Sequence, residues 1–155
     1  MLRALAFLAA LPCAFAHEVT TSRLGPAPFE PGQMFAASND LKDADGNQLV
    51  TSYVVRRPDG NWSVMLVNRD EANSHSVRVI FEDSANSRTA SFAGPVTVVT
   101  FGSEQYVWIN DGPNSHPDPD NPPIATVVAA GPPTIFMLPK ASITVLRGRV
   151  TGLGD

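Results

Sequence analysis

Residues 49–68, LVTSYVVRRPDGNWSVMLVN, decide the fold of this chain. Leu49–Arg57 is rich in Val, Thr and Tyr, which favour extended backbone. The following Pro58-Asp59-Gly60-Asn61 predicts a reversal, because Pro presets φ and Gly accepts a positive φ. Trp62–Asn68 then returns with apolar residues on both faces, which is typical of a central strand. The segment therefore predicts an antiparallel hairpin in the interior of a sheet.

Short runs of β-branched and apolar residues continue to the end of the chain, separated by turn residues. These runs occupy residues 75–82, 96–101, 104–110, 124–130, 134–138 and 142–150. No helical period competes with them, so the sequence predicts an all-β domain over residues 41–150. We expect a two-sheet antiparallel β-sandwich of about eight strands. Residues 17–40 contain two Pro/Gly clusters and predict an irregular lead-in segment.

The first sixteen residues predict a secretory signal peptide. Arg3 supplies the positive charge, residues 4–11 are apolar, and Ala14-Phe15-Ala16 is a small-x-small cleavage site. We therefore expect a secreted or periplasmic protein that loses its single cysteine, Cys13, with the signal. No other segment is long and apolar enough to span a membrane. The formal net charge is −4 and the basic residues form no run, which argues against nucleic acid as a partner.

The sequence offers no catalytic machinery that can be recognised. A glycosidase needs two carboxylates at a fixed separation, whereas most acidic residues here stand in turns. We expect no catalytic residue, no cofactor and no activity from the chain alone. Asp43-x-Asp45-x-Asn47 imitates the start of an EF-hand loop, but the glycine comes early and the bidentate Glu is missing. This segment predicts a turn rather than a calcium site.

His17 raises one metal hypothesis. Cleavage after Ala16 makes His17 the N-terminal residue, whose α-amino group and imidazole suit copper in a tetragonal site. Such a site needs a second histidine, either His75 or His116. A secreted copper protein is therefore one alternative function, set against an ordinary polar residue after a signal peptide.

Tyr106 and Trp108 are the candidate contact residues. In an extended segment over residues 104–110 they share one face, while Val107 and Ile109 share the other. If the aliphatic face belongs to the core, the two aromatic rings form an outward platform for a sugar or a partner domain. The alternative is that both faces are buried.

Several motifs resemble the C-terminal β-sandwich of (β/α)₈ glycoside hydrolases, most closely the family 39 xylosidase-like enzymes. The motifs are Asp43–Asn47, Leu49–Tyr53, Arg57–Ser63, Met65–Asp70, Val99–Tyr106 and Leu138–Arg147, within a match of about residues 36 to 150. In that family the sandwich packs against the barrel, and the barrel carries the catalytic glutamates, so no catalytic residue transfers to this chain. The resemblance implies a non-catalytic accessory domain whose partner is a (β/α)₈ catalytic domain or a polysaccharide. A free-standing carbohydrate-binding module is the other alternative.

Overall fold

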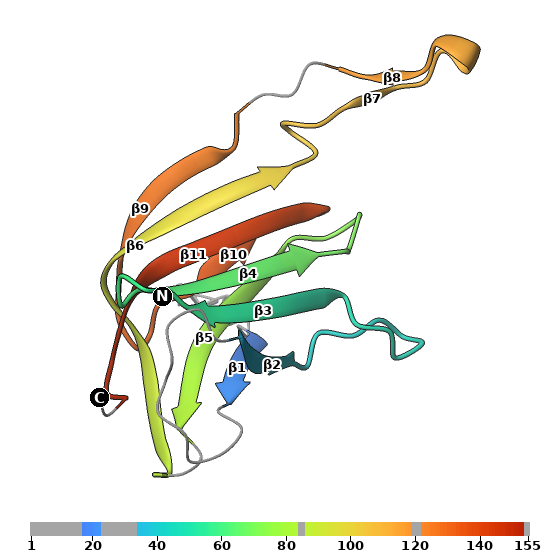
Figure 1. Ribbon diagram of the computed structural model, residues 1–155. Helices are drawn as coiled ribbons and strands as arrows, with labels where there is room; N and C mark the ends of the chain where they lie inside the picture. Colours follow the sequence, from blue (N-terminus) through green and yellow to red (C-terminus); the bar gives the residue numbers. More distant parts are fainter. Residues whose placement is uncertain (1–16, 23–33, 84–85, 119–121, 154–155) are drawn as a thin grey trace, which may run out of the picture.

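A computed structural model describes residues 17–22, 34–83, 86–118 and 122–153 (Figure 1). These residues form eleven strands, one three-residue 3₁₀ turn and no α-helix. The strands are β1 (His17–Ser22), β2 (Met34–Asn39), β3 (Val50–Arg56), β4 (Trp62–Asn68), β5 (His75–Asp83), β6 (Arg88–Gly102), β7 (Trp108–Ile109), β8 (His116–Pro117), β9 (Ile124–Ala130), β10 (Phe136–Leu138) and β11 (Ser142–Thr151). The predicted all-β class is confirmed. The predicted signal peptide, with Cys13, lies outside the described residues.

The strands do not separate into the two sheets of the predicted sandwich. Seven of them form a closed ring in the order β5-β1-β2-β3-β4-β11-β6, and the pairing of β6 with β5 closes it. The β1–β5 pair is parallel, whereas every other neighbouring pair in the ring is antiparallel. The fold is therefore a seven-stranded closed barrel, with β10 added on β5 and β9 added on β6.

The length of β6 explains this correction. Residues 88–90 of β6 pair with β5, and residues 91–102 pair with β11. Gly94, with φ of 77°, and Pro95 stand where the pairing of β6 with β11 shifts register and where its pairing with β9 begins. The sequence prediction began this strand only at Val96, because no run of β-branched residues precedes that position. One continuous strand thus joins two layers that a sandwich would keep apart.

Two further strands arise where the sequence predicted an irregular lead-in over residues 17–40. Residues 17–22 form β1 between β2 and β5, and residues 34–39 form β2 between β1 and β3. The prediction is wrong for these two segments, because pairing with neighbouring strands satisfies their backbone groups despite the Pro and Gly residues between them. Both strands are members of the ring.

The central hairpin forms as predicted. The Arg57 N–H donates to the Asn61 carbonyl at 2.8 Å, and the Gly60 N–H donates to the Arg57 carbonyl at 3.0 Å. Gly60 has a φ of 78°, a conformation that favours glycine. On its two sides β4 pairs with β3 and with β11, so it is the central strand that the apolar pattern predicted.

The ring encloses a chain of aromatic side chains from five strands. Trp62 lies 4.9 Å from Phe35 and 5.1 Å from Phe81 between ring centroids, and Phe81 lies 5.1 Å from Phe92. Phe136 is the last of these aromatic side chains, and its ring centroid lies 6.2 Å from that of Phe92. All of these contacts except that of Phe35 with Trp62 are edge-on, and edge-on contacts add about 0.5–1.5 kcal/mol per pair beyond the area that they bury. The core therefore ties β2, β4, β5, β6 and β10 together.

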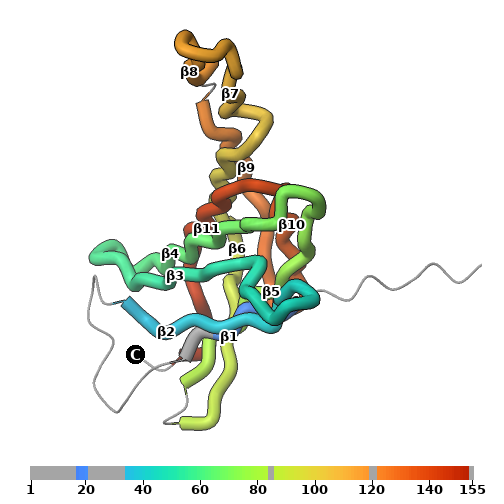
Figure 2. The backbone as a smooth tube through the Cα atoms, turned by 90° about the vertical axis from the view of Figure 1, so that its right-hand side faces the viewer, coloured from blue at the N-terminus to red at the C-terminus, as the bar shows by residue number. Residues whose placement is uncertain are grey.

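Residues 106–118 stand away from the ring as an arm, shown in Figure 2. The sequence predicted a strand over 104–110 and a loop over 113–123. In the structure, Gln105 and Tyr106 form a turn on the Gly102 carbonyl, and only Trp108–Ile109 is extended. These two residues pair with residues 116 and 117 of the predicted loop, across the 3₁₀ turn η1 (Gly112–Asn114).

Among the described residues, no helix has the length and apolar character needed to cross a membrane.

Candidate functional site

The outside of the sheet β3-β4-β11-β6-β9 is unusually apolar. Successive residues of a strand point to opposite faces, so every second side chain of these strands points away from the core. The pairing register arranges them in two rows, Tyr53-Met65-Val145-Val99-Ala125 and Thr51-Val67-Ile143-Phe101. We call these nine residues the outer face. Only Thr51 among them carries a polar side chain other than the Tyr53 hydroxyl.

The outer face is accessible to solvent over much of its area. Tyr53 is 45% exposed and Ile143 is 41% exposed, while Met65 and Val67 between them are half-buried. A contiguous apolar patch that is exposed on a protein surface marks an interaction site. The sequence carried a signal of it, because apolar residues were already predicted on both faces of β4, and Met65 and Val67 occupy the outer one. What the sequence did not show is that the same rows continue over four neighbouring strands.

A groove marks the end of the outer face that lies next to the arm. Val67, Ile143, Phe101 and Tyr106 contribute to its lining, and its volume is about 370 Å³. Apolar atoms make up most of the surface that it exposes. This groove joins the outer face to the first aromatic residue of the arm.

The structure places both sequence-predicted contact residues on the surface. Tyr106 is 43% exposed and Trp108 is 53% exposed. The reasoning behind that prediction was wrong in one respect, because Val107 and Ile109, expected in the core, are 46% and 37% exposed. The alternative in which both faces are buried is also wrong. Since the arm lies outside the ring, neither of its faces meets the core.

His17 lies beside His75, one of the two partners suggested for it. The two ring centroids are 6.4 Å apart with an interplanar angle of 84°. His17 Nδ1 lies 3.2 Å from Asp40 Oδ1, and His75 Nε2 lies 2.9 Å from Asp70 Oδ2. The other suggested partner, His116, stands on the arm. In the described part of the chain, no group of three or more His, Cys, Asp or Glu side chains could hold a metal ion.

Two turn carboxylates are held by local hydrogen bonds. Asp43 accepts the side-chain N–H and the backbone N–H of Asn47, and these bonds lower the pKa of its carboxyl. The predicted turn at this position is confirmed. Asp70 accepts the backbone N–H groups of Ala72 and Asn73, which lower the pKa of its carboxyl to about 2. Both carboxylates organise the backbone around them.

Comparison with known proteins gives matches among solved structures alone. No family model matches the chain, and no curated protein matches it. A GH51 α-L-arabinofuranosidase from Thermotoga petrophila RKU-1 is 9% identical, with a TM-score of 0.49, over 76% of this chain and 26% of that one. The Clostridium thermocellum GH family 44 endoglucanase is 10% identical, with a TM-score of 0.43, over 75% of this chain and 19% of that one.

A bifunctional glucanase-xylanase from a metagenome library is 16% identical, with a TM-score of 0.45, over 76% of this chain and 18% of that one. The chain thus spans about a quarter or less of the length of these three structures. The assignment to family 39 made from the sequence stays a prediction, since two of these glycoside hydrolases belong to families 51 and 44. At low identity, this chain is similar to a portion of glycoside hydrolases of families 51 and 44.

Proposed function

We propose that this chain is a non-catalytic accessory domain of an exported glycoside hydrolase-like protein, and that its outer face packs against a (β/α)₈ catalytic domain. The observation that carries this proposal is the pair of apolar rows across β3, β4, β11, β6 and β9. The sequence motifs that resemble the sandwich of family 39 enzymes indicate which kind of partner we propose, because in those enzymes the sandwich packs against a (β/α)₈ barrel. The catalytic glutamates belong to that partner, so the isolated chain hydrolyses no xyloside.

The chemistry of the outer face fits a protein better than a sugar. A sugar site combines ring-stacking aromatic side chains with several placed hydrogen-bonding groups. The outer face instead presents mainly aliphatic side chains, such as Val67, Ile143 and Val145, with few polar atoms among them. Apolar side chains of this kind resemble the centre of an interface between domains, where water is excluded.

The experiment combines this chain with a family 39 (β/α)₈ catalytic domain expressed without its own C-terminal β-domain. Sedimentation velocity measures association, and thermal unfolding of the catalytic domain measures stabilisation. We expect one-to-one association and a raised Tm, both lost in Ile143→Asp, because the substitution places a charge within the buried area. Met137→Asp is the matched control, since Met137 is 58% exposed on β10 and lies off the outer face.

Failure to associate, or equal losses in the two variants, contradicts the accessory role. Repeating the experiment with a family 51 catalytic domain tests whether the partner belongs to that family instead. Association with the family 51 domain alone overturns the family 39 assignment while keeping the accessory role.

The exposed aromatic residues of the arm favour a second candidate, a free-standing carbohydrate-binding module. Trp108 is 53% exposed, whereas Trp62 is 5% exposed, so a sugar that quenches tryptophan fluorescence reports on Trp108. Titration with xylan, arabinoxylan and cellulose separates the two functions. Saturable quenching that disappears in Trp108→Ala makes the chain a binding module, and an unchanged spectrum favours the accessory domain.

The third candidate, a secreted copper protein, rests on the approach of His17 to His75 within 6.4 Å. It further requires the α-amino group of His17 as a ligand, because the two imidazoles alone leave the tetragonal site of Cu(II) incomplete. Titration with Cu(II) of protein that begins at His17, followed by electron paramagnetic resonance, tests it against the variant His75→Gln. An unchanged spectrum in that variant excludes the site.

A further inference from the structure

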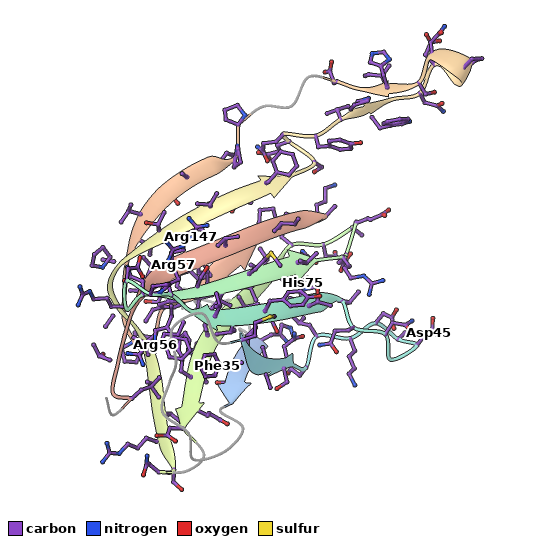
Figure 3. The ribbon with its side chains drawn as sticks, viewed as in Figure 1. Phe35, Asp45, Arg56, Arg57, His75 and Arg147 are labelled. Atoms are coloured by element: carbon purple, nitrogen blue, oxygen red, sulfur yellow. The ribbon has the colours of Figure 1, made fainter. Side chains whose placement is uncertain are left out.

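Three arginine side chains line one cleft at the opposite end of the sheet from the arm. Arg57 follows β3, whereas Arg147 and Arg149 belong to β11, and Asn61 and Thr97 line the same cleft. The cleft has a volume of about 520 Å³. Figure 3 shows Arg57 and Arg147 near each other at the end of the sheet where β3 turns into β4. We call this the arginine cleft.

The alternation of β11 places two of the arginines on the same side. Arg147 and Arg149 are exposed, and Gly148 between them points into the core. A Cβ atom at Gly148 would lie 2.8 Å from Val96 Cγ2 and 3.3 Å from the Pro95 carbonyl oxygen. The glycine therefore lets β11 lie close against β6, and the pairing register shifts at this point between the two arginines. Both guanidinium groups extend from the same short segment of backbone.

Asp59 accepts a hydrogen bond from Arg57, but its single negative charge does not cancel the charge of three arginines. Its carboxylate accepts the Asn61 backbone N–H at 3.0 Å and the Arg57 Nε–H at 3.3 Å. Among the residues that the structure describes, only the Nε of Arg57 meets a side-chain partner, which leaves its terminal nitrogens to a ligand. Within the described ranges, the guanidinium groups of Arg147 and Arg149 form no hydrogen bond or ion pair with a protein group.

The charge of the cleft is opposite to that of the chain. The protein carries a net charge of −4 with only 11 basic residues, and three of those line this cleft beside a single carboxylate. Guanidinium groups stay protonated at any physiological pH and form paired hydrogen bonds to planar anions such as carboxylates. Like charges gathered in this way repel one another, and an anionic ligand removes that repulsion.

We infer that the arginine cleft binds a carboxylate-bearing sugar, a hexuronate residue of an acidic polysaccharide. The guanidinium groups of Arg147 and Arg149 take the carboxylate, and Asn61 and Thr97 supply hydrogen bonds to hydroxyl groups. Val127 and Pro95 give the cleft an apolar side for the C–H face of the sugar ring. The choice of a sugar among possible carboxylates rests on the carbohydrate-related role proposed above.

The experiment compares two ligands that differ by one charge. The full chain is titrated calorimetrically with a xylo-oligosaccharide that carries one glucuronic acid branch, and with the unbranched oligosaccharide of the same length. We expect binding of the acidic ligand that weakens with added salt, and binding of the neutral one at least about tenfold weaker, because charge-assisted hydrogen bonds are lost.

Arg147→Gln and Arg149→Gln each weaken binding of the acidic ligand by about tenfold or more. Arg88→Gln is the control, because Arg88 is an exposed arginine at the start of β6 that does not line the cleft. Equal affinity for the two ligands, no binding of either, or unchanged affinity in both cleft variants overturns the inference.

The same variants separate this inference from the accessory role. If the cleft receives an acidic side chain of the catalytic domain instead, Arg147→Gln weakens domain association and the acidic oligosaccharide does not bind, which overturns the hexuronate site. Conversely, Ile143→Asp removes domain association and leaves hexuronate binding intact. Loss of one function therefore does not imply loss of the other.

Discussion

The side chain of Asn68 joins three segments of the chain through hydrogen bonds. The number of these bonds sets how much stability the protein should lose when the side chain is removed. The side chain is 2% exposed at the end of β4. Its amide group donates to the carbonyl oxygens of Asn73 at 3.1 Å and Pro139 at 2.8 Å, and its oxygen accepts the Asp70 N–H at 3.0 Å. A longer contact at 3.4 Å reaches the Leu138 carbonyl. The residue thus fixes the loop after β4 and the turn before β11 to each other.

Replacement of Asn68 by Ala removes three good hydrogen bonds and leaves their backbone partners without them. Each such bond contributes about 0.5–1.5 kcal/mol net, so we expect the free energy of unfolding to fall by about 2–4 kcal/mol. For a chain of this size that corresponds to a decrease in Tm of about 5–15 °C. Chemical denaturation followed by circular dichroism measures the change directly.

Asn68→Asp is the matched control, because it keeps the shape and the acceptor oxygen but removes the donor. Its carboxylate faces two carbonyl oxygens, so burial and the lack of a donor raise the pKa of the new carboxyl. We expect a loss at neutral pH at least as large as that of Asn68→Ala. The loss shrinks as pH falls from the raised native pKa towards about 4, the pKa of an unfolded Asp, because the protonated carboxyl donates again. A change below about 0.5 kcal/mol in either variant at neutral pH refutes the reasoning.

Three further predictions concern the core and the loop after β4. Gly148→Val should lower the free energy of unfolding by about 1–3 kcal/mol, because the new Cβ alone would lie 2.8 Å from Val96 Cγ2. Chemical denaturation measures the change, and unchanged stability contradicts the close packing of β11 on β6. Trp62→Ala should lower the free energy of unfolding by about 3–5 kcal/mol, since it leaves a cavity between the rings of Phe35 and Phe81. Chemical denaturation measures this loss as well, and a loss below about 1 kcal/mol contradicts the prediction. Asp70 has a pKa lowered to about 2, so its contribution to stability is present above its ordinary pKa of 3.8 and is lost as pH falls through about 2. The stability difference between the wild type and Asp70→Asn should therefore close across that range, and a difference that is constant with pH contradicts the assignment.

The strands that the sequence predicted well are short apolar or β-branched runs that turn residues bound on at least one side. Residues 62–68 and 124–130 were predicted with the bounds that the structure gives to β4 and β9. The turn over Pro58–Asn61 also follows from its residues, because Pro and Gly restrict the backbone locally. These features depend on neighbours in sequence and need no knowledge of the fold.

The strands that the sequence missed are those that depend on a partner. Residues 88–95 are small or polar apart from Phe92, and they become part of β6 because they pair first with β5 and then with β11. Residues 17–22 become β1 in the same way, between β2 and β5. Backbone groups in such segments are satisfied by strands far away in the sequence, which a local pattern cannot reveal.

The exposure of Tyr106 and Trp108 was predicted, although for an incomplete reason. Alternation predicted that Val107 and Ile109 would lie in the core, but all four residues are exposed because residues 106–118 stand outside the ring. The approach of His17 to His75 was an open possibility in the sequence, and only the parallel pairing of β1 with β5 realises it.

The sequence by itself determined the all-β class, the central hairpin and the apolar second face of β4, because these follow from residue chemistry over a few positions. The tertiary structure alone decided that seven strands close into a ring, that the apolar rows join into one outer face, and that Arg57, Arg147 and Arg149 share a cleft. The physical reason is that register between distant strands is selected by burial of the whole core. The neighbours of a side chain across a sheet therefore depend on all of the strands and cannot be read from one strand alone.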